Sequence, residues 1–243
     1  MHVILAGGNG TVGSAILAQA LLHPSITRLT LLLRRPLALS LSSPKLHIII
    51  HEDFLSYPPA LLEQLKGAQA CLWAIGVTGV GAKVEGDYEK ITRDFAVEAA
   101  KAFAALREDG EKFVFCFLSA ATANQAVGKA WGEAGRVRGE AEATLVALTS
   151  TLPLATYFFR PAPVRSSNPT VPFTTFQNIR FYLMSRFVID DDVISNAMIQ
   201  AALQGGSGEI EGWEGKGKPG NEGAFGIGEM KLLAAESVLA KKE

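Results

Sequence analysis

A glycine-rich segment near the start of the chain carries the clearest chemical signal. Glycine recurs every third position from 7 to 13, in a segment that reads Gly7, Gly8, Asn9, Gly10, Thr11, Val12, Gly13. It follows a short hydrophobic run directly, and a helical pattern begins near Thr11. Such spacing permits a tight turn, close approach of a pyrophosphate to the backbone, and close packing of strand on helix. Because the first N–H groups of the helix would face the phosphates, the segment predicts a dinucleotide-binding turn.

A pair of arginines indicates which dinucleotide this turn would bind. Proteins that bind NAD place Asp or Glu about 20 residues beyond the glycines, where the acid holds the ribose 2′-hydroxyl. That region here contains Arg34 and Arg35, followed by proline, and no acidic residue. Two guanidinium groups can bind the oxygens of a 2′-phosphate through planar, charge-assisted hydrogen bonds. The sequence therefore favours NADP(H) over NAD(H) as the cofactor.

Hydrophobic runs that alternate with helical patterns predict the elements that position these residues. The expected strands are 2–6, 28–34, 47–51, 71–75, 112–118 and 155–159. The clearest helix is expected to begin at an N-cap formed by Asp87. It would bury one stripe of apolar residues, namely Tyr88, Ile91, Phe95, Ala99, Ala102 and Leu106. Further helices are expected over 137–148, after 190–192, and over 229–239.

This alternation predicts an α/β fold, a Rossmann-type doubly wound, mainly parallel sheet with helices on both faces and a small C-terminal cap. We expect a single domain over residues 1–243, with irregular segments at about 162–189 and 204–228 and one short strand near Ile210. Aromatic and apolar side chains of the first irregular segment are expected to form a substrate wall. The side chains of this expected substrate wall are Phe173, Phe176, Phe181, Tyr182 and Met184.

The composition is that of a soluble globular protein. Hydrophobic residues make up 48% of the chain, and 23 basic residues nearly balance 24 acidic ones. Neither a nucleic-acid partner nor a membrane partner is therefore expected. No apolar run approaches the roughly 20 residues of a membrane helix, and the N-terminus has no basic leader. The two cysteines lie in apolar stretches, which favours free thiols in a reducing compartment. We expect a cytoplasmic monomer or homodimer that binds a small-molecule substrate.

The histidines do not predict a metal site. His47 and His51 are the closest pair in the sequence, but along a strand they would lie about 13 Å apart. A zinc site needs ligands much closer to one another and a third partner. No metal is therefore expected.

Taken together, the motifs resemble the short-chain dehydrogenase/reductase superfamily, specifically its atypical branch of Tat-interacting-protein-like NAD(P)H-binding oxidoreductases. The resemblance covers about residues 1–203. Besides the glycine turn and the arginine pair, it rests on Asp53-Phe54, Ala74-Ile75-Gly76, Leu118-Ser119-Ala120, Val137-Arg138-Gly139-Glu140 and Arg160-Pro161.

The resemblance also implies roles for several of these residues. Asp53 and Phe54 would lie at the adenine, with the acid accepting a hydrogen bond from the exocyclic amine. Gly76 would pass beneath the adenosine ribose, and Pro161 would begin the segment that flanks the nicotinamide. Ser119 occupies the position from which a serine hydrogen-bonds the substrate carbonyl in this superfamily.

One part of the catalytic motif of this superfamily is missing. Its reductases carry Tyr-x-x-x-Lys on the helix after the fifth strand, and the tyrosine gives a proton to the developing alkoxide. Aligned on residues 137–140, the lysine position is Arg138 and the tyrosine position is Ala134. Arg138 can hold a ribose hydroxyl but cannot exchange protons near neutral pH. Ala134 cannot act as an acid, and general acid catalysis typically contributes about 10²–10⁴ in rate. Tyr182, Tyr88 and a water held by Ser119 are alternative proton sources.

Three functions are compatible with these observations. The first is an NADPH-dependent oxidoreductase acting on a small, largely apolar carbonyl or enone, with Ser119 and Arg138 in catalysis and Arg138 also contacting the cofactor. Conjugate reduction of an enone would relax the need for a strong acid at oxygen. The second is a non-catalytic NADP(H)-binding regulatory protein. The third is a redox-neutral isomerase or cyclase that reuses the cofactor pocket.

Overall fold

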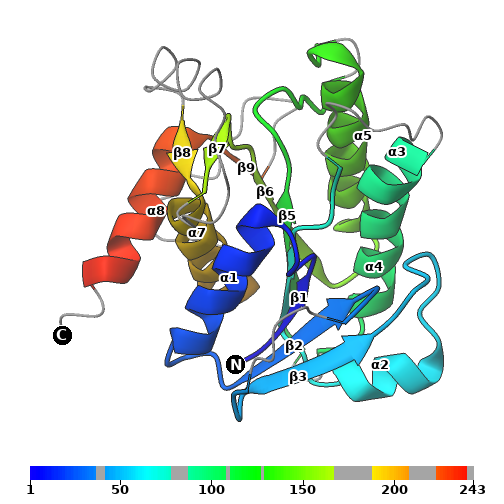
Figure 1. The fold of residues 1–243 in the computed structure, drawn as a ribbon. Coiled ribbons are helices and arrows are strands. Elements are labelled where there is room, and N and C mark those ends of the chain that lie inside the picture. The colour runs from blue at the N-terminus through cyan, green and yellow to red at the C-terminus, as the bar shows by residue number, and fades with distance from the viewer. Residues whose placement is uncertain are drawn as a thin grey trace.

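Parallel strands form the central sheet of the protein (Figure 1). The computed structural model describes residues 1–36, 42–77, 87–107, 110–126, 129–166, 188–207 and 223–239. Within these ranges the sheet has seven strands in the order β3-β2-β1-β4-β5-β6-β9, all pairing in parallel. Their bounds are β1 His2–Ala6, β2 Arg28–Leu33, β3 Leu46–Ile50, β4 Ala70–Trp73, β5 Phe113–Leu118, β6 Leu154–Phe159 and β9 Ala224–Phe225. The order reverses between β1 and β4, where an open α/β sheet leaves a crevice for ligands.

Helices cover both faces of this sheet (Figure 1). One face packs against α1 (Thr11–Leu22), α7 (Asp191–Gln204) and α8 (Ile227–Leu239). The other packs against α2 (Pro59–Leu65), α4 (Phe95–Phe103) and α5 (Gly132–Leu148). The shorter elements are α3 Asp87–Glu89, the π-helical turn η1 Lys90–Asp94, the 3-10 turn η3 Gly205–Ser207, and the paired strands β7 Val164–Arg165 and β8 Ile189–Asp190.

Each central strand divides its side chains between two hydrophobic cores. Along β1, Val3 and Leu5 pack toward α1 and α7, while Ile4 and Ala6 pack toward α2 and α4. Because successive side chains of a strand point to opposite faces, a strand covered by helices on both sides is apolar throughout. This explains the uninterrupted hydrophobic runs of the sequence, and it confirms the predicted α/β class and doubly wound parallel sheet.

The predicted strands agree with the structure to within about two residues at each end. Strand β3 is less buried than the central strands, and it lies at one edge of the sheet. Its residues Ile48 and Ile50 are 44% and 46% exposed, because only one neighbouring strand and partial helix coverage protect them. The two cysteines, Cys71 and Cys116, are buried free thiols on opposite faces of the sheet. Burial raises the pKa of both thiols.

Several details differ from the sequence-based expectations. The single helix predicted from Asp87 to Leu106 is instead α3, the π-helical turn η1 and α4, which ends at Phe103. Asp87 is the first residue of α3 rather than a cap preceding it. The wider π-helical turn interrupts the regular period, and the backbone N–H of Phe95 reaches back to the carbonyl of Lys90. The helix α2 and the two-residue strand β9 were not predicted.

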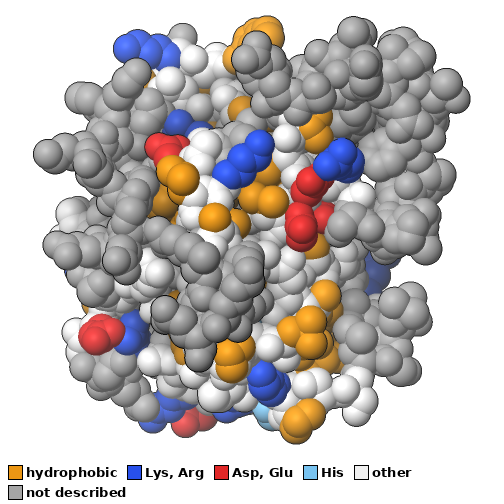
Figure 2. All heavy atoms as spheres, turned by 90° about the vertical axis from the view of Figure 1, so that its left-hand side faces the viewer, with side chains coloured by type: hydrophobic (Ala, Val, Ile, Leu, Met, Phe, Trp, Pro, Cys, Tyr) orange, Lys and Arg blue, Asp and Glu red, His pale blue; other side chains and the backbone are white. Residues whose placement is uncertain are grey.

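Two further predictions concern residues outside the described ranges. The expected substrate wall (Phe173, Phe176, Phe181, Tyr182 and Met184) and the short strand expected near Ile210 fall in 167–187 and 208–222. None of the helices in the described ranges combines the length and hydrophobicity required to cross a membrane. On the side of α8, hydrophobic, basic and acidic side chains of the described residues are interspersed (Figure 2).

Candidate functional site

A groove lies at the carboxyl ends of the strands, where the strand order reverses. It consists of two adjoining cavities of about 560 Å³ and about 350 Å³ that share Gly10, Ala74, Ile75 and Gly76. The larger cavity is lined by the start of α1, by Arg138, and by the segments that follow β4, β5 and β6. The smaller one is lined by the glycine turn and by the segment that follows β2. The groove therefore has two ends with the glycine turn between them.

The glycine turn has a shape that side chains would destroy. Gly7 has φ +89°, and a Cβ added there would lie 2.6 Å from the carbonyl carbon of Ala74. A Cβ on Gly13 would lie 2.0 Å from the carbonyl oxygen of Gly7. The turn is closed by a hydrogen bond of 3.0 Å from the N–H of Gly10 to the same oxygen. Glycine is thus required at 7 for the tight turn and at 13 for the packing of α1 against it.

Gly10 and Gly8 differ from these two positions. The nearest atom to a Cβ on Gly10 would be 3.5 Å away, so the space next to it is open to the groove. Gly10 precedes α1 without a side-chain cap, which leaves the first N–H groups of the helix free to bind a ligand. The three atoms nearest to a Cβ on Gly8 would all belong to the side chain of Leu31, the closest at 2.5 Å. Thr11 and Val12 line the larger cavity, and Asn9 lines the smaller one.

At the other end of the smaller cavity lies the arginine pair. Arg34 and Arg35 follow β2 directly, are exposed, and line this cavity together with Phe54. Phe54 is only 1% exposed and packs edge-on against Trp73, with ring centroids 5.8 Å apart. Asp53 is exposed, and its Oδ1 accepts a hydrogen bond of 3.1 Å from the N–H of Leu55. The structure thus brings Phe54 and both arginines to the groove, whereas the carboxylate of Asp53 stabilises its own turn.

Ser119 belongs to a buried polar cluster that sequence reasoning missed. Ser119 lines the larger cavity, and its hydroxyl donates a hydrogen bond of 2.5 Å to Oε1 of Glu142, which is fully buried. The same carboxylate accepts hydrogen bonds from Nε2 of Gln125, at 3.1 Å, and from Nε of Arg160, at 3.0 Å. Nη2 of Arg160 makes a further short contact to Oε2. The carboxylate is therefore neutralised and hydrogen-bonded on both oxygens, as a buried charge requires.

Arg138 lies opposite the segment that follows β4. Its Nη1 donates to the hydroxyl of Tyr88 at 2.5 Å, and its Nη2 donates to the carbonyl oxygen of Val77 at 3.4 Å. A Cβ on Gly76 would lie 3.7 Å from Nη2, so the guanidinium and Gly76 flank the same part of the cavity. Pro161 begins the segment 161–164, which also lines this cavity. Ser119, Arg138, Gly76 and Pro161 thus line one cavity.

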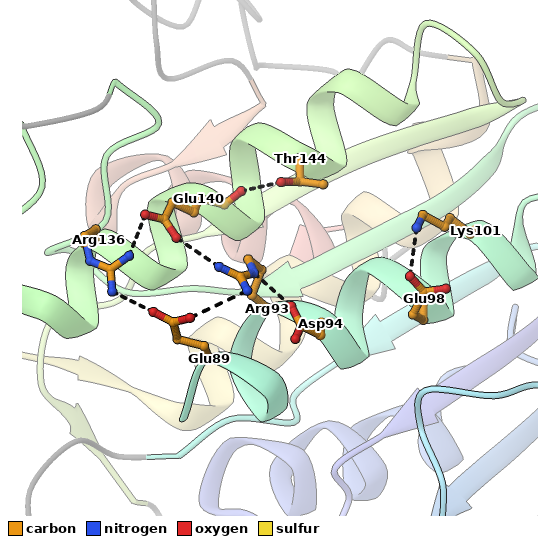
Figure 3. A network of polar contacts seen from close by, with 8 residues as sticks. All are labelled: Glu89, Arg93, Asp94, Glu98, Lys101, Arg136, Glu140 and Thr144. Atoms are coloured by element: carbon orange, nitrogen blue, oxygen red, sulfur yellow. Dashed lines mark hydrogen bonds and ion pairs between the residues drawn. The ribbon is translucent and has the colours of Figure 1, made fainter. Parts of the chain in front are cut away.

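A network of ion pairs fixes α3 and η1 against α5 (Figure 3). Arg136 contacts Glu89 at 2.7 Å and Glu140 at 2.6 Å, and Arg93 contacts Glu140 at 3.2 Å and Glu89 at 3.6 Å. Asp94 accepts a further hydrogen bond of 2.8 Å from Arg93. The hydrogen bond donated by Arg136 lowers the pKa of Glu89, and the hydrogen bonds that Arg93 and Arg136 donate to acidic partners raise the pKa of both arginines. These charges hold the segment that carries Tyr88 next to Arg138.

Two residues of the buried cluster could have been found from the sequence: Glu142 from its spacing on α5, and Arg160 from its place at the end of a strand. Glu142 lies four residues after Arg138 on α5, so both side chains are on one face of the helix. Arg160 ends β6 within the motif that carried the resemblance. No three His, Cys, Asp or Glu side chains of the described ranges come together as a metal site.

Comparison with known proteins places this geometry in context. No family model matches the chain. The leucinostatins biosynthesis cluster protein T of Purpureocillium lilacinum is 39% identical over 119 residues, which are 49% of this chain and 42% of that protein. The match therefore spans less than half the length of this relative. The mitochondrial protein fmp52 of Emericella nidulans is 26% identical over 220 residues, 86% of this chain and 90% of that protein.

Solved structures share the arrangement of strands and helices. The dTDP-glucose 4,6-dehydratase DesIV of Streptomyces venezuelae, with NAD bound, matches at a TM-score of 0.64 and 13% identity over 98% of this chain and 81% of that chain. Gre2 of Candida albicans, in complex with NADPH, matches at a TM-score of 0.60 and 13% identity over 84% of this chain and 75% of that chain. The chain therefore has the fold of these nucleotide-binding enzymes.

Proposed function

We propose that the protein is an NADP(H)-dependent oxidoreductase of the atypical short-chain dehydrogenase/reductase type that acts on a small, largely apolar carbonyl compound or enone. The observation that carries this proposal is the order of groups along the groove. Exposed Arg34 and Arg35 lie at one end, the glycine turn lies in the middle, and Ser119 and Arg138 lie at the other end. A phosphate-bearing adenosine, a pyrophosphate and a nicotinamide follow one another in the same order in NADP(H).

The residues of the groove fit such a cofactor. The free N–H groups at the start of α1, next to the open space at Gly10, would hold the pyrophosphate. Arg34 and Arg35 would bind the 2′-phosphate, and Arg138 would bind the nicotinamide ribose. When bound, NADP(H) supplies or accepts a hydride. Solved structures of this fold that contain NAD or NADPH support a nicotinamide nucleotide, and the arginine pair supports the phosphorylated form.

The other groups at this end of the groove suit an apolar substrate with one oxygen. Val12, Leu118, Ala120 and Pro161 contribute apolar wall, which favours a compound with few polar groups. Arg138 lines this cavity, and its guanidinium would stabilise negative charge that develops on a substrate oxygen. The single hydroxyl proton of Ser119 is donated to Glu142, so in this arrangement the serine does not also donate a hydrogen bond to a substrate carbonyl.

The test is a titration followed by a turnover assay. Purified protein is titrated with NADPH and NADH, with binding followed by energy transfer from tryptophan to the nicotinamide. It is then mixed with NADPH and a panel of apolar aldehydes, ketones and enones, and loss of NADPH absorbance is recorded. We expect tight NADPH binding, weaker NADH binding and consumption of NADPH. Tight binding without consumption would instead support the regulatory alternative, and failure to bind either nucleotide would refute both.

The cytoplasm is our proposed compartment, supported by the two buried free thiols. The relative fmp52 carries a mitochondrial designation, which makes the mitochondrion the specific alternative. Fluorescence microscopy of the tagged full chain against a mitochondrial marker separates the two. The relative from the leucinostatins biosynthesis cluster supports a biosynthetic role for the reaction.

A further inference from the structure

The larger cavity offers few polar side chains to a substrate. Among the described residues that line it, three have polar side chains, namely Thr11, Ser119 and Arg138. Thr11 begins α1 beside the glycine turn, where the phosphates of the cofactor would lie. Ser119 and Arg138 are therefore the side chains that can make hydrogen bonds to a substrate at the other end of the groove, whose remaining described wall is apolar or glycine.

The hydroxyl of Ser119 is already committed as a donor. A hydroxyl has one proton to donate and two lone pairs that can accept, and this proton goes to Oε1 of Glu142 at 2.5 Å. Glu142 is fully buried, forms an ion pair with Arg160 and accepts a further hydrogen bond from Gln125. A hydrogen bond to an ionised acceptor is stronger than one to a neutral carbonyl. The proton of Ser119 therefore stays with Glu142 when a ligand binds, and its oxygen is left as an acceptor.

Arg138 has the opposite hydrogen-bonding character. A guanidinium carries five N–H donors and no acceptor, and Nε of Arg138 is buried without a partner among the described residues. A ligand group that bonds to both side chains must accept from Arg138 and donate to Ser119. A hydroxyl group does both. A carbonyl oxygen can only accept, and next to Ser119 it would place its lone pairs against those of the serine.

We propose, on the basis of the function proposed above, that Ser119 accepts a hydrogen bond from a hydroxyl group of the substrate, so that the larger cavity binds an apolar alcohol in preference to the corresponding carbonyl compound. Glu142 is the positioning residue that gives the serine this role, which is the reverse of the donor role that the resemblance implies. The oxidant is NADP⁺, which takes a hydride from the carbinol carbon and becomes NADPH. The electron pair of the O–H bond forms the C=O π bond, and the hydroxyl proton leaves to water.

The first test compares an alcohol and a ketone with the same carbon frame. The protein is saturated with 1,4,5,6-tetrahydro-NADP, which cannot transfer a hydride, and is titrated by calorimetry with each enantiomer of 4-phenyl-2-butanol and with 4-phenyl-2-butanone. We expect the better alcohol enantiomer to bind at least about fivefold more tightly than the ketone. In Ser119→Ala the Kd for this alcohol should rise about 3- to 12-fold, as for one lost hydrogen bond, and the Kd for the ketone should stay within about twofold. Ser150→Ala, which removes an exposed serine hydroxyl beyond the end of α5, is the matched control and should change neither Kd.

The second test releases the proton of Ser119. Glu142→Leu combined with Arg160→Met removes both members of the buried ion pair, a replacement that buried pairs often tolerate. With the carboxylate gone, the serine can donate to a ligand, so the Kd for the ketone should fall at least about threefold and the preference for the alcohol should shrink or reverse. Circular dichroism and urea unfolding establish that the double variant folds. If it does not fold, Ser119→Ala decides the assignment.

The outcomes separate this assignment from the proposed function. A wild type that binds the ketone as tightly as the alcohol, a Ser119→Ala variant that binds the ketone more weakly, or a folded double variant with the preference of the wild type would each overturn the assignment. Weaker binding of tetrahydro-NADP by Ser119→Ala would also overturn it, because the serine would then bond to the cofactor. Failure of the wild type to bind NADPH, or to interconvert the alcohol and the ketone with NADP⁺ or NADPH, would overturn the proposed function and this assignment with it.

Discussion

Ser119 and Glu142 are joined by a hydrogen bond of 2.5 Å that links the wall of the larger cavity to a fully buried carboxylate. Ser119 follows β5, Glu142 lies on α5, and Arg160 reaches the same carboxylate from the end of β6. Three elements that meet at the groove are thus joined through one side chain. The orientation of the Ser119 hydroxyl is therefore set by the interior of the protein rather than by a ligand.

Replacing Glu142 by alanine should lower the free energy of unfolding by about 3–5 kcal/mol, because Arg160 would lose the carboxylate that it binds within a largely buried site. Urea unfolding of both proteins at neutral pH measures this difference. Glu98→Ala is the control, since Glu98 forms an exposed ion pair with Lys101 whose loss should cost about 0–1 kcal/mol. Equal losses for the two variants would show that the buried cluster does not contribute to stability.

Replacing both Arg34 and Arg35 should weaken the binding of NADPH but not that of NADH. We expect Arg34→Ala combined with Arg35→Ala to raise the Kd for NADPH by about 10- to 150-fold, since hydrogen bonds to charged groups contribute about 1.5–3 kcal/mol. The Kd for NADH should stay the same, because NADH lacks the 2′-phosphate. Fluorescence titration measures both constants, and Lys101→Ala controls for the loss of a positive charge from the surface. A parallel loss of affinity for both nucleotides would refute a 2′-phosphate site at these arginines.

Alanine at two glycines of the turn should affect different properties: NADPH binding at Gly10 and stability of the fold at Gly13. In Gly10→Ala the added Cβ has room in the protein but enters the open space of the groove, so NADPH binding should be lost with stability changed by less than about 1 kcal/mol. In Gly13→Ala the Cβ would collide with the carbonyl oxygen of Gly7, which should destabilise the fold by about 1–3 kcal/mol. Thermal unfolding and NADPH titration of each variant test this contrast. Tight NADPH binding by Gly10→Ala would show that the phosphates do not approach this backbone.

The parts of the site that sequence predicted are those in which neighbours along the chain determine the geometry. The glycine turn closes through contacts between Gly7, Gly10 and Gly13, all within seven residues, and its spacing is visible in the sequence. The arginine pair follows a hydrophobic strand directly, so its place at the carboxyl edge of the sheet follows from the strand alone.

The parts that sequence could not predict depend on distant contacts. The sequence offers Tyr88, Tyr182 and a water held by Ser119 as proton sources without ranking them, and the hydrogen bond between Tyr88 and Arg138 joins residues 50 positions apart, so the sequence cannot show it. Glu142 has the appearance of a surface residue on a helix, but it is fully buried, and its partners Ser119 and Arg160 follow β5 and β6. The strand β9 has two residues and follows a glycine-rich stretch, so its pairing with Phe158 and Phe159 leaves no periodic pattern.

A buried histidine should make the fold sensitive to mild acid. His2 is 8% exposed, its Nε2 is 2.8 Å from the hydroxyl of Thr30, and burial, with a smaller contribution from Arg28, lowers its pKa from 6.5 to about 4. The folded state therefore binds a proton less readily than the unfolded chain. Stability from this source is complete above pH 6.5 and is lost as the pH falls from 6.5 towards 4.

In His2→Gln the amide can still bond to Thr30 but does not titrate, so the variant should lose less stability than the wild type between pH 7.5 and pH 4.5. We expect the two losses to differ by on the order of 2 kcal/mol, because the ring keeps partial access to solvent and the full shift is not realised. Urea unfolding at both pH values measures the losses, and comparison of each protein with itself removes the constant effect of the substitution. Equal losses would mean that His2 is protonated as readily in the folded protein as in the unfolded chain, and the acid sensitivity of the fold would then have to arise from its carboxylates.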